Sequence, residues 1–259
     1  MRWLFVIAAL AASLQSSALS AAEVPSPADA VRQLGAMNWY SEEYPPYNFR
    51  KDGKLKGFSV DILMAAFDKI GVKITRNDIK IVPWNRSYKF VQRNPGTALF
   101  SMTYTPEREK LMKFVGPAAP IRIAIIAPKA KKLKGLSLGK LSTLKIGVVR
   151  DDIGDQLLRK IAISDGAIQR KNSLKQLIYL LKKDRVDAVA YAVDVFNFAM
   201  KNDGEDPKEF EEAMLLKEGA MGYAFHKSTD PAVLAHLQKA MDELRREGRI
   251  EAIISSYTK

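Results

Sequence analysis

The apolar residues of this chain recur with two alternating periods. Five of them fall on one face of a predicted helix that starts near residue 59, namely Ile62, Leu63, Ala66, Phe67 and Ile70. Short apolar runs at 98–102 and 144–149 are instead typical of buried strands. Because such helices and strands alternate along the chain, the pattern predicts an α/β fold with mostly parallel sheets and helices on both faces.

Two extended segments divide this alternation into two lobes. One is the run FVGPAAPIRIAIIAPK at 114–129, and the other is the strand-like GAMGYAFHK at 219–227. We expect a first lobe of residues 23–124 plus 220–259 and a second lobe of residues 125–219, joined by two extended crossings. Ligands of open α/β sheets bind at the carboxyl ends of the strands, so the sequence predicts a hinged clamp with a ligand cleft between its lobes.

The first residues differ in composition from the rest. Arg2 precedes an apolar run from Trp3 to Leu14, and small residues continue to Ala22. This composition predicts a secretory signal peptide over 1–22, cleaved near Ala22. The alternative is a membrane anchor, but the apolar run is too short and too polar to span about 30 Å of hydrocarbon. The chain contains no cysteine for a disulfide or a lipid anchor, so we expect a soluble periplasmic protein.

Composition argues against several classes of function. The formal net charge is +12, but the lysines are spread over many segments and are not joined to aromatic platforms, so nucleic acid is not the expected partner. The two histidines, His226 and His236, are too few for a metal site or a histidine-based triad. A glycine-rich phosphate loop is also missing from the sequence. We therefore expect no metal, no cofactor and no enzymatic activity.

The segment SMTYTPERE, which begins at Ser101, carries the most informative candidate chemistry. Thr105 and Pro106 predict a helix start, and Arg108 then falls in the first turn, where exposed amides favour acidic side chains. An arginine at this position is explained if an anionic ligand completes the site, because a guanidinium binds a carboxylate through two parallel hydrogen bonds. Ser101 and Thr103 stand beside it at the end of a predicted strand.

Aromatic residues follow two other predicted strands. Tyr44 and Tyr47 flank a rigid Pro-Pro pair, and Trp84 follows a strand at 79–82. Aromatic walls with a few fixed hydrogen-bonding groups are typical of small-ligand pockets. Core or loop packing explains any single one of these aromatics equally well.

Four stretches resemble the family 3 extracellular solute-binding proteins, which bind polar amino acids for ABC importers. They are EYPPYNFRKDGKLKGFSVDIL, SMTYTPEREKLMKFVGPAAP, KIGVVRDD with DRVDAVAY, and GAMGYAFHKSTDP with LRREGRIEAIISSY. Together they cover nearly the whole predicted mature chain. The resemblance implies a type II periplasmic-binding-protein fold with two α/β lobes on a two-stranded hinge, a monomer, and an inner-membrane ABC permease as partner.

The resemblance also implies ligand-binding roles in the first lobe. The matching residues are Tyr44, Trp84, Arg86, Ser101, Thr103 and Arg108. In the family, the arginine at the position of Arg108 forms a salt bridge with the ligand's α-carboxylate, assisted by donors such as Ser101 and Thr103. The aromatic that stacks over the ligand aligns with Tyr44, while Trp84 and Arg86 align more loosely with a loop that enters the cleft.

The second lobe departs from the family pattern. Asp151 and Asp152 align with the family's second-lobe ligand loop, although acidic residues at a helix start explain them as well. Ala192 stands where α-amino-acid binders have an aspartate that binds the ligand's ammonium. Asp194, Asp152 or Glu43 could meet an ammonium instead, but none is the matching residue.

These patterns together predict a periplasmic solute-binding protein. It is expected to capture a small carboxylate-bearing solute, an amino acid or a relative, by lobe closure, and to deliver it to an ABC importer. One alternative is an enzyme on the same scaffold, similar to the cyclohexadienyl dehydratases, and another is a ligand-sensing module.

Overall fold

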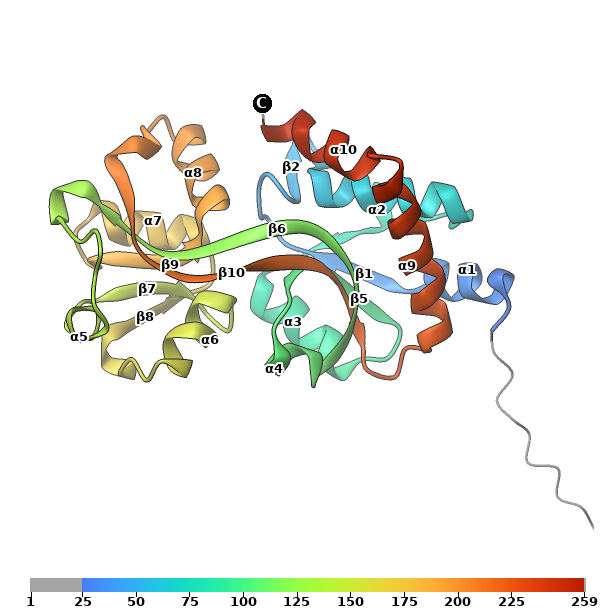
Figure 1. The fold of residues 1–259 in the computed structure, drawn as a ribbon, viewed down its shortest axis with the longest axis horizontal. Helices are drawn as coiled ribbons and strands as arrows, with labels where there is room; N and C mark the ends of the chain where they lie inside the picture. The colour runs from blue at the N-terminus through green and yellow to red at the C-terminus, as the bar shows by residue number, and fades with distance from the viewer. Residues whose placement is uncertain (1–24, 259) are drawn as a thin grey trace, which may run out of the picture.

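Two lobes lie side by side in the computed structural model, which describes residues 25–258 (Figure 1). The long strands β6 (Met112–Pro128) and β10 (Phe210–His226) run between the lobes and belong to both, which confirms the predicted pair of crossings. The predicted signal peptide, 1–22, lies outside the described residues. Within residues 25–258, no helix has the length and apolar character needed to cross a lipid bilayer.

One sheet passes through both lobes. Its other strands are β1 (Asn38–Ser41), β4 (Lys80–Ile81), β5 (Thr97–Thr103), β7 (Ile146–Val149), β8 (Ile168–Lys171) and β9 (Ala188–Ala192). The strand order is β4-β1-β5-β10-β6-β9-β7-β8. β10 pairs with β5 at 221–225, and β6 pairs with β9 at 123–126, so each lobe is attached to a different end of the β6–β10 pair.

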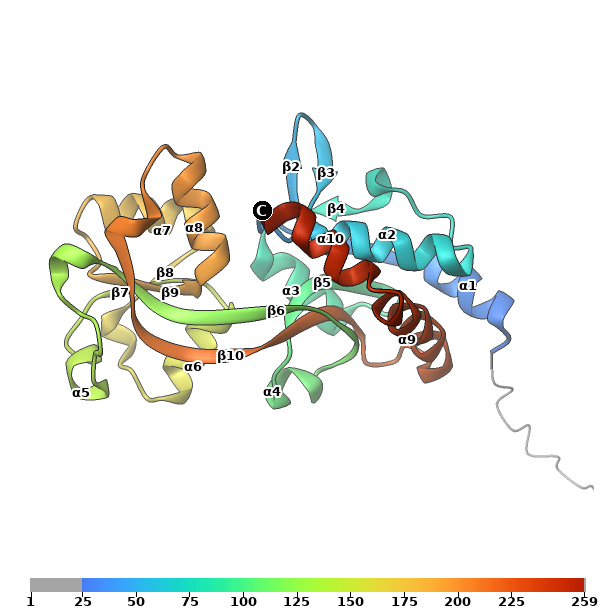
Figure 2. The same cartoon turned by 45° about the horizontal axis from the view of Figure 1, so that its top comes forward.

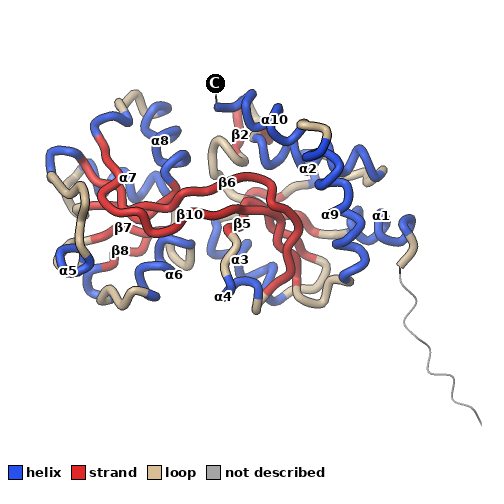
Figure 3. Tube along the Cα trace, in the orientation of Figure 1, coloured by secondary structure: helices blue, strands red, loops and turns tan. Residues whose placement is uncertain are grey.

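The first lobe surrounds its strands with helices. They are α1 (Pro27–Ala36), α2 (Phe58–Ile70), α3 (Trp84–Arg93), α4 (Pro106–Glu109), α9 (Pro231–Arg246) and α10 (Arg249–Thr258). Figure 3 shows these helices around the strands of this lobe. Every residue of β5 is buried, because the strand is covered on both faces. In the core, the Trp39 ring meets Phe67 and Phe225 edge to face, with centroids 5.1 and 5.6 Å away.

A two-stranded hairpin projects from the first lobe. Its strands are β2 (Phe49–Lys51) and β3 (Lys54–Lys56), and Asp52 and Gly53 form the turn with φ values of 54° and 72°. A turn with two positive φ values favours Asp-Gly, since glycine adopts this conformation without steric cost. Figure 2 shows the hairpin standing beside α10.

The second lobe repeats the alternation of strands and helices. Its helices are α5 (Leu138–Leu141), α6 (Ile153–Lys160), α7 (Leu174–Lys182) and α8 (Val193–Asn202). Single 3-10 turns lie at Arg76–Asp78 in the first lobe, and at Lys129–Lys131, Asp165–Ala167 and Pro207–Glu209 further along the chain. β7 pairs in parallel with both β8 and β9, as expected for strands joined by helices.

Parallel pairing fixes where the polar residues gather. β1 pairs in parallel with both β4 and β5, so the carboxyl ends of these three strands lie at one edge of the sheet in the first lobe. β7 and β9 share an edge in the second lobe in the same way. The residues that follow these five strands meet between the lobes, at the edge where α/β sheets bind ligands.

Candidate functional site

Arg108 lies at the centre of the contact between the lobes. The hydroxyl of Thr105 accepts a hydrogen bond from the Arg108 backbone amide at 3.1 Å, and Pro106 is the first residue of α4, which confirms the predicted helix start. The Arg108 side chain is 1% exposed. Its Nη1 donates to the carbonyl of Thr103 at 3.2 Å, and its Nε donates to Oε1 of Gln156, in the second lobe, at 3.1 Å.

Two aromatic rings support the Arg108 guanidinium. Its Cζ lies 5.2 Å from the centroid of Trp84 and 5.5 Å from that of Tyr88, and the two rings stack with centroids 5.3 Å apart. Cation–π attraction therefore offsets part of the cost of burying this charge. Burial still lowers the pKa of Arg108, and the charge of Asp152 opposes that change.

The guanidinium is not fully bonded. Nη2 of Arg108 is buried without a hydrogen-bond acceptor, and the nearest acidic oxygen is Oδ1 of Asp152 at 3.8 Å, beyond hydrogen-bond distance. Ser41 Oγ and Trp84 Nε1 are also buried and unpartnered. Ser41 is the last residue of β1, Trp84 follows β4, and Arg108 follows β5. Each of these three parallel strands therefore ends near a donor without an acceptor.

Asp152 reaches Arg108 from the second lobe. It is the N-cap of α6, where its Oδ1 accepts a hydrogen bond from the Ile153 amide at 2.6 Å, so it has the ordinary role of an acid at a helix start and also faces the cleft. Burial raises the pKa of Asp152, while the charge of Arg108 lowers it. Asp151 points elsewhere, with its carboxylate 3.8 Å from Arg159 of the same lobe.

The structure adds Glu42, which sequence reasoning missed. Glu42 follows β1, and burial together with the charge of Asp152 raises its pKa well above the ordinary value. The rings of Tyr44 and Tyr191, one from each lobe, stand 5.7 Å apart. Burial raises the pKa of both phenols, and the charges of Glu42 and Asp152 act in the same direction on each.

Glu42 and Tyr191 could have been found in the sequence from their positions at the ends of predicted strands. Glu42 follows β1 directly, and Tyr191 is the penultimate residue of β9. Glu42 and Glu43 are adjacent, and the pattern alone does not say which side chain turns inward. The structure shows Glu43 exposed, with its carboxylate accepting from the Arg50 amide at 3.0 Å.

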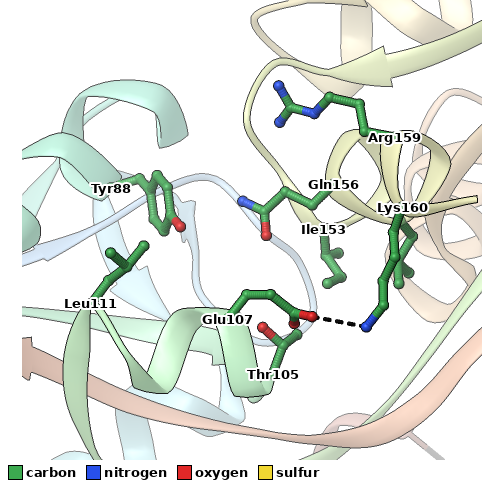
Figure 4. Close-up of a pocket in the computed structure, with 9 residues that line it drawn as sticks. Tyr88, Thr105, Glu107, Leu111, Ile153, Gln156, Arg159 and Lys160 are labelled. Carbon is green, nitrogen blue, oxygen red and sulfur yellow. Dashed lines mark hydrogen bonds and ion pairs between the residues drawn. The ribbon is translucent and has the colours of Figure 1, made fainter. Parts of the chain in front are cut away.

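Two cavities lie between the lobes. The first, of about 450 Å³, is lined by Tyr88, Thr105, Glu107, Leu111, Ile153, Gln156, Leu157, Arg159 and Lys160. Figure 4 shows Tyr88 and Leu111 opposite Gln156 and Ile153 across it. The second, of about 240 Å³, is lined by Glu42, Glu43, Ile81, Val82, Pro83, Trp84, Asn172, Ser173, Leu174 and Tyr191. The stacked pair of Tyr88 and Trp84 therefore contributes one ring to each cavity.

The other predicted residues have different placements. Ser101 has a φ of 62° and its hydroxyl hydrogen-bonds to Oδ1 of Asn48, while Thr103 contributes its carbonyl to Arg108. Both are buried beside the cluster. Arg86 is exposed, its guanidinium lies 5.9 Å from the ring of Phe90, and it lines neither cavity. The structure brings Tyr44, Trp84, Thr103, Arg108 and Asp152 together, and leaves Arg86 outside.

Further contacts join the lobes around this cluster. Lys160 Nζ lies 2.8 Å from the carboxylate of Glu107 (Figure 4). This hydrogen bond holds the pKa of Glu107 at about 2. On the other side, the hydroxyl of Tyr47 lies 3.4 Å from Oδ2 of Asp194 in the second lobe and 3.1 Å from the carbonyl oxygen of Pro120. With these contacts the lobes enclose the cluster, which corresponds to a closed clamp.

Known proteins share both the sequence pattern and this fold. The model of the bacterial extracellular solute-binding proteins, family 3, matches residues 39–259. The chain belongs to this family. A relative in Neisseria gonorrhoeae, named as a probable histidine-binding protein, is 26% identical over 219 residues, covering 83% of this chain and 80% of its own. The arginine-binding extracellular protein ArtP of Bacillus subtilis is 24% identical over 216 residues, covering 82% of each chain.

Solved structures confirm the type II periplasmic-binding-protein fold. An ABC uptake transporter substrate-binding protein from Streptococcus pneumoniae, solved with bound histidine, superposes with a TM-score of 0.75 at 15% identity, covering 87% of this chain and 93% of its own. In sequence this chain is therefore a family 3 extracellular solute-binding protein, and in structure it has two lobes joined by two long strands.

The second lobe presents a carboxyl group to the cleft, but not at position 192. Ala192, at the end of β9, is buried and offers no carboxylate. The buried second-lobe acid that faces Arg108 is instead Asp152, whose Oδ1 lies 3.8 Å from the guanidinium. Within the described residues, no three acidic or histidine side chains form a metal site.

Proposed function

We propose that this protein captures a small carboxylate-bearing solute, an amino acid or a related compound, by closing its two lobes around it. The observation that carries the proposal is the buried guanidinium of Arg108, whose Nη2 has no hydrogen-bond acceptor. A buried donor without an acceptor costs roughly 1–3 kcal/mol, and more when it is charged. A ligand carboxylate bound to Nη2 would remove that cost.

The groups proposed to face the ligand come from both lobes, which supports closure. Arg108, Trp84 and Tyr44 come from the first lobe, while Gln156 and Asp152 come from the second. A solute that contacts both sets gains its full binding free energy only when the lobes are together. Binding therefore shifts the hinge equilibrium toward the closed form.

The family and the N-terminal sequence support a biological setting for this proposal. The relatives are named as binding proteins for histidine and arginine, which supports an amino acid or a compound like one as the solute. We propose that residues 1–22 are a signal peptide, that the mature protein is a periplasmic monomer, and that an inner-membrane ABC permease receives the solute from its closed form.

A thermal-shift screen against amino acids and related carboxylic acids tests the proposal. A ligand at about one hundred times its Kd adds roughly 2.7 kcal/mol to the free energy of unfolding. Arg108→Met keeps the packing against Trp84 and Tyr88 but removes the charge, and should abolish the shift. Arg86→Met, on the exposed side of α3, is the matched control and should retain it. Equal shifts in both variants would overturn the role of Arg108.

Binding without turnover is part of the same proposal. The sequence places no acid at Ala192, but Asp152 does bring a carboxyl group into the second-lobe side of the cleft. Turnover of prephenate or arogenate by the purified protein would therefore identify a dehydratase on this scaffold. We expect neither compound to be converted.

A further inference from the structure

The densest group of lysines lies in the second lobe. Residues 129–145 contain six lysines and no acidic residue, whereas the other residues of 125–219 include twelve basic and fourteen acidic ones. The excess positive charge of this lobe is therefore concentrated in one segment. A surface with charge of a single sign attracts partners of the opposite sign.

The segment 129–145 lies at the end of the second lobe opposite the cleft. It runs from the end of β6 through α5 to the start of β7, and β7 pairs in parallel with β9. The segment therefore meets the amino end of β7, while the carboxyl ends of β7 and β9 face the cleft. Figures 1 and 2 both show the segment as the outermost part of this lobe. A partner bound here would leave the cleft accessible to solutes.

Buried leucines hold the segment so that its lysines face solvent. The backbone amide of Leu136 donates to the carbonyl of Ala213 at 3.1 Å. The second-lobe core contains four leucines of the segment, which are Leu133, Leu136, Leu141 and Leu144. Lys131 pairs with Asp184 and Asp187. Four other lysines are exposed and form no ion pair within residues 25–258, namely Lys129, Lys132, Lys134 and Lys140.

An apolar side chain stands among these lysines. Leu138 is the first residue of α5 and is 55% exposed. Surfaces that bind lipid bilayers combine such side chains with cations, because the apolar group enters the boundary of the acyl chains while the cations meet the phosphates. Residues 129–145 contain no aromatic side chain on which the bases of a nucleic acid could stack. The composition therefore favours a lipid surface over a nucleic acid.

We infer that the four exposed lysines of residues 129–145, together with Leu138, bind the surface of an anionic lipid bilayer. Such a bilayer presents negative charge over a wide area, so it can meet all five side chains of an outward-facing end at once. Each lysine near the surface strengthens the attachment by about fivefold. The attachment would concentrate the protein at the membrane, and it does not depend on which solute the cleft binds.

Sedimentation with lipid vesicles tests the inference. One set of vesicles contains equal parts of phosphatidylglycerol and phosphatidylcholine, and the other contains phosphatidylcholine alone. The wild-type protein should bind the anionic vesicles about tenfold or more tightly than the neutral ones, and added salt should reduce this preference. Equal binding to both sets, or binding to neither, would overturn the inference. Retention on a polyglutamate resin without a preference for anionic vesicles would indicate an acidic protein as the partner and would also overturn it.

Two sets of four substitutions give variants of equal net charge. The test set is Lys129→Gln, Lys132→Gln, Lys134→Gln and Lys140→Gln. The control set takes exposed lysines of the first lobe, Lys54→Gln, Lys73→Gln, Lys89→Gln and Lys239→Gln. The test set should weaken binding to the anionic vesicles by about tenfold or more, and the control set by less than about threefold. Equal weakening by the two sets would show that net charge alone matters and would overturn the placement.

Leu138→Ser tests the apolar contact separately. It should weaken binding to the anionic vesicles by about threefold or more, and unchanged binding would overturn the role of Leu138. All variants are compared in the same purified form, so that residues 1–22 contribute equally to each. The test set should keep the wild-type thermal shift with a solute, because its lysines lie away from the cleft. Loss of vesicle binding with that shift intact would support the inference, and loss of both would overturn the separation of this surface from the cleft.

Discussion

The contact between Asp152 and Arg108 predicts that the ligand-free protein is partly held closed by its own side chains. The two groups lie on different lobes, 3.8 Å apart, and both are nearly inaccessible to solvent. Opening the hinge would separate them and hydrate both. Asp152→Asn should therefore shift the ligand-free hinge toward the open form without unfolding either lobe, because asparagine also caps helices well.

The size of the effect follows from the geometry. Two unit charges at 3.8 Å attract by about 4 kcal/mol at an effective dielectric constant of about 20, and desolvation offsets much of this. Exposed pairs contribute at most about 1 kcal/mol and removal of one partner of a buried pair costs about 3–5 kcal/mol. This pair is buried but makes no hydrogen bond. We therefore expect Asp152→Asn to destabilise the closed form relative to the open form by about 1–3 kcal/mol, which lowers the ratio of closed to open molecules roughly 5- to 150-fold.

Fluorescence energy transfer between the lobes measures this ratio. The chain has no cysteine, so dyes can be attached at Lys73→Cys and Lys175→Cys, which are exposed positions on the first and second lobes. Asp151→Asn is the matched control, because Asp151 also lies 3.8 Å from an arginine, Arg159, but within one lobe. The same distance distribution for the Asp152 and Asp151 variants would refute the reasoning.

Two further predictions concern the lobes. Glu107→Gln should change the closed fraction only slightly and lose that effect at high salt, because Glu107 and Lys160 are both more than half exposed. The pair lowers the pKa of Glu107 to about 2, so its contribution to the closed form is complete above about pH 5 and disappears as the pH falls toward 2. Measuring energy transfer across a pH series checks this prediction. Gly154→Ala should destabilise the second lobe by about 1–3 kcal/mol in urea unfolding, since a Cβ there would collide with the carbonyl oxygen of Ala190. Gly139→Ala is the control and should not destabilise it, because the space around Gly139 is open. Equal unfolding midpoints for the two variants would contradict the packing of α6 against β9.

Local patterns determined which parts of the site could be predicted from the sequence. Thr105 and Pro106 define a helix start by short-range chemistry, and so the sequence alone places Arg108 at a helix terminus. The alternation of strands and helices likewise predicted the two α/β lobes and their two crossings. These features depend on residues that are close in sequence.

Side-chain direction was the part that short-range patterns did not settle. The buried face of α3 is formed by Trp84, Ser87, Tyr88 and Val91, at helical spacing, and Arg86 lies on the opposite face. Had the helix start at Trp84 been known, this periodicity would have excluded Arg86 as a candidate site residue and indicated Tyr88 in its place. The pKa of Glu42 is raised by burial and by the charge of Asp152, which is 110 positions away in the chain, and no local pattern reports on such a long-range effect.

Calorimetric titration of one amino-acid ligand and of its carboxamide into the wild-type protein tests the role of Arg108 most directly. The carboxamide keeps the size and the ammonium of the ligand but removes the charge that Arg108 Nη2 is proposed to bind. Loss of hydrogen bonds to a charged group costs about 1.5–3 kcal/mol, so the carboxamide should bind roughly ten- to a hundredfold more weakly than the acid. Equal affinities would show that the buried arginine does not hold the ligand carboxylate, and would contradict the proposed function.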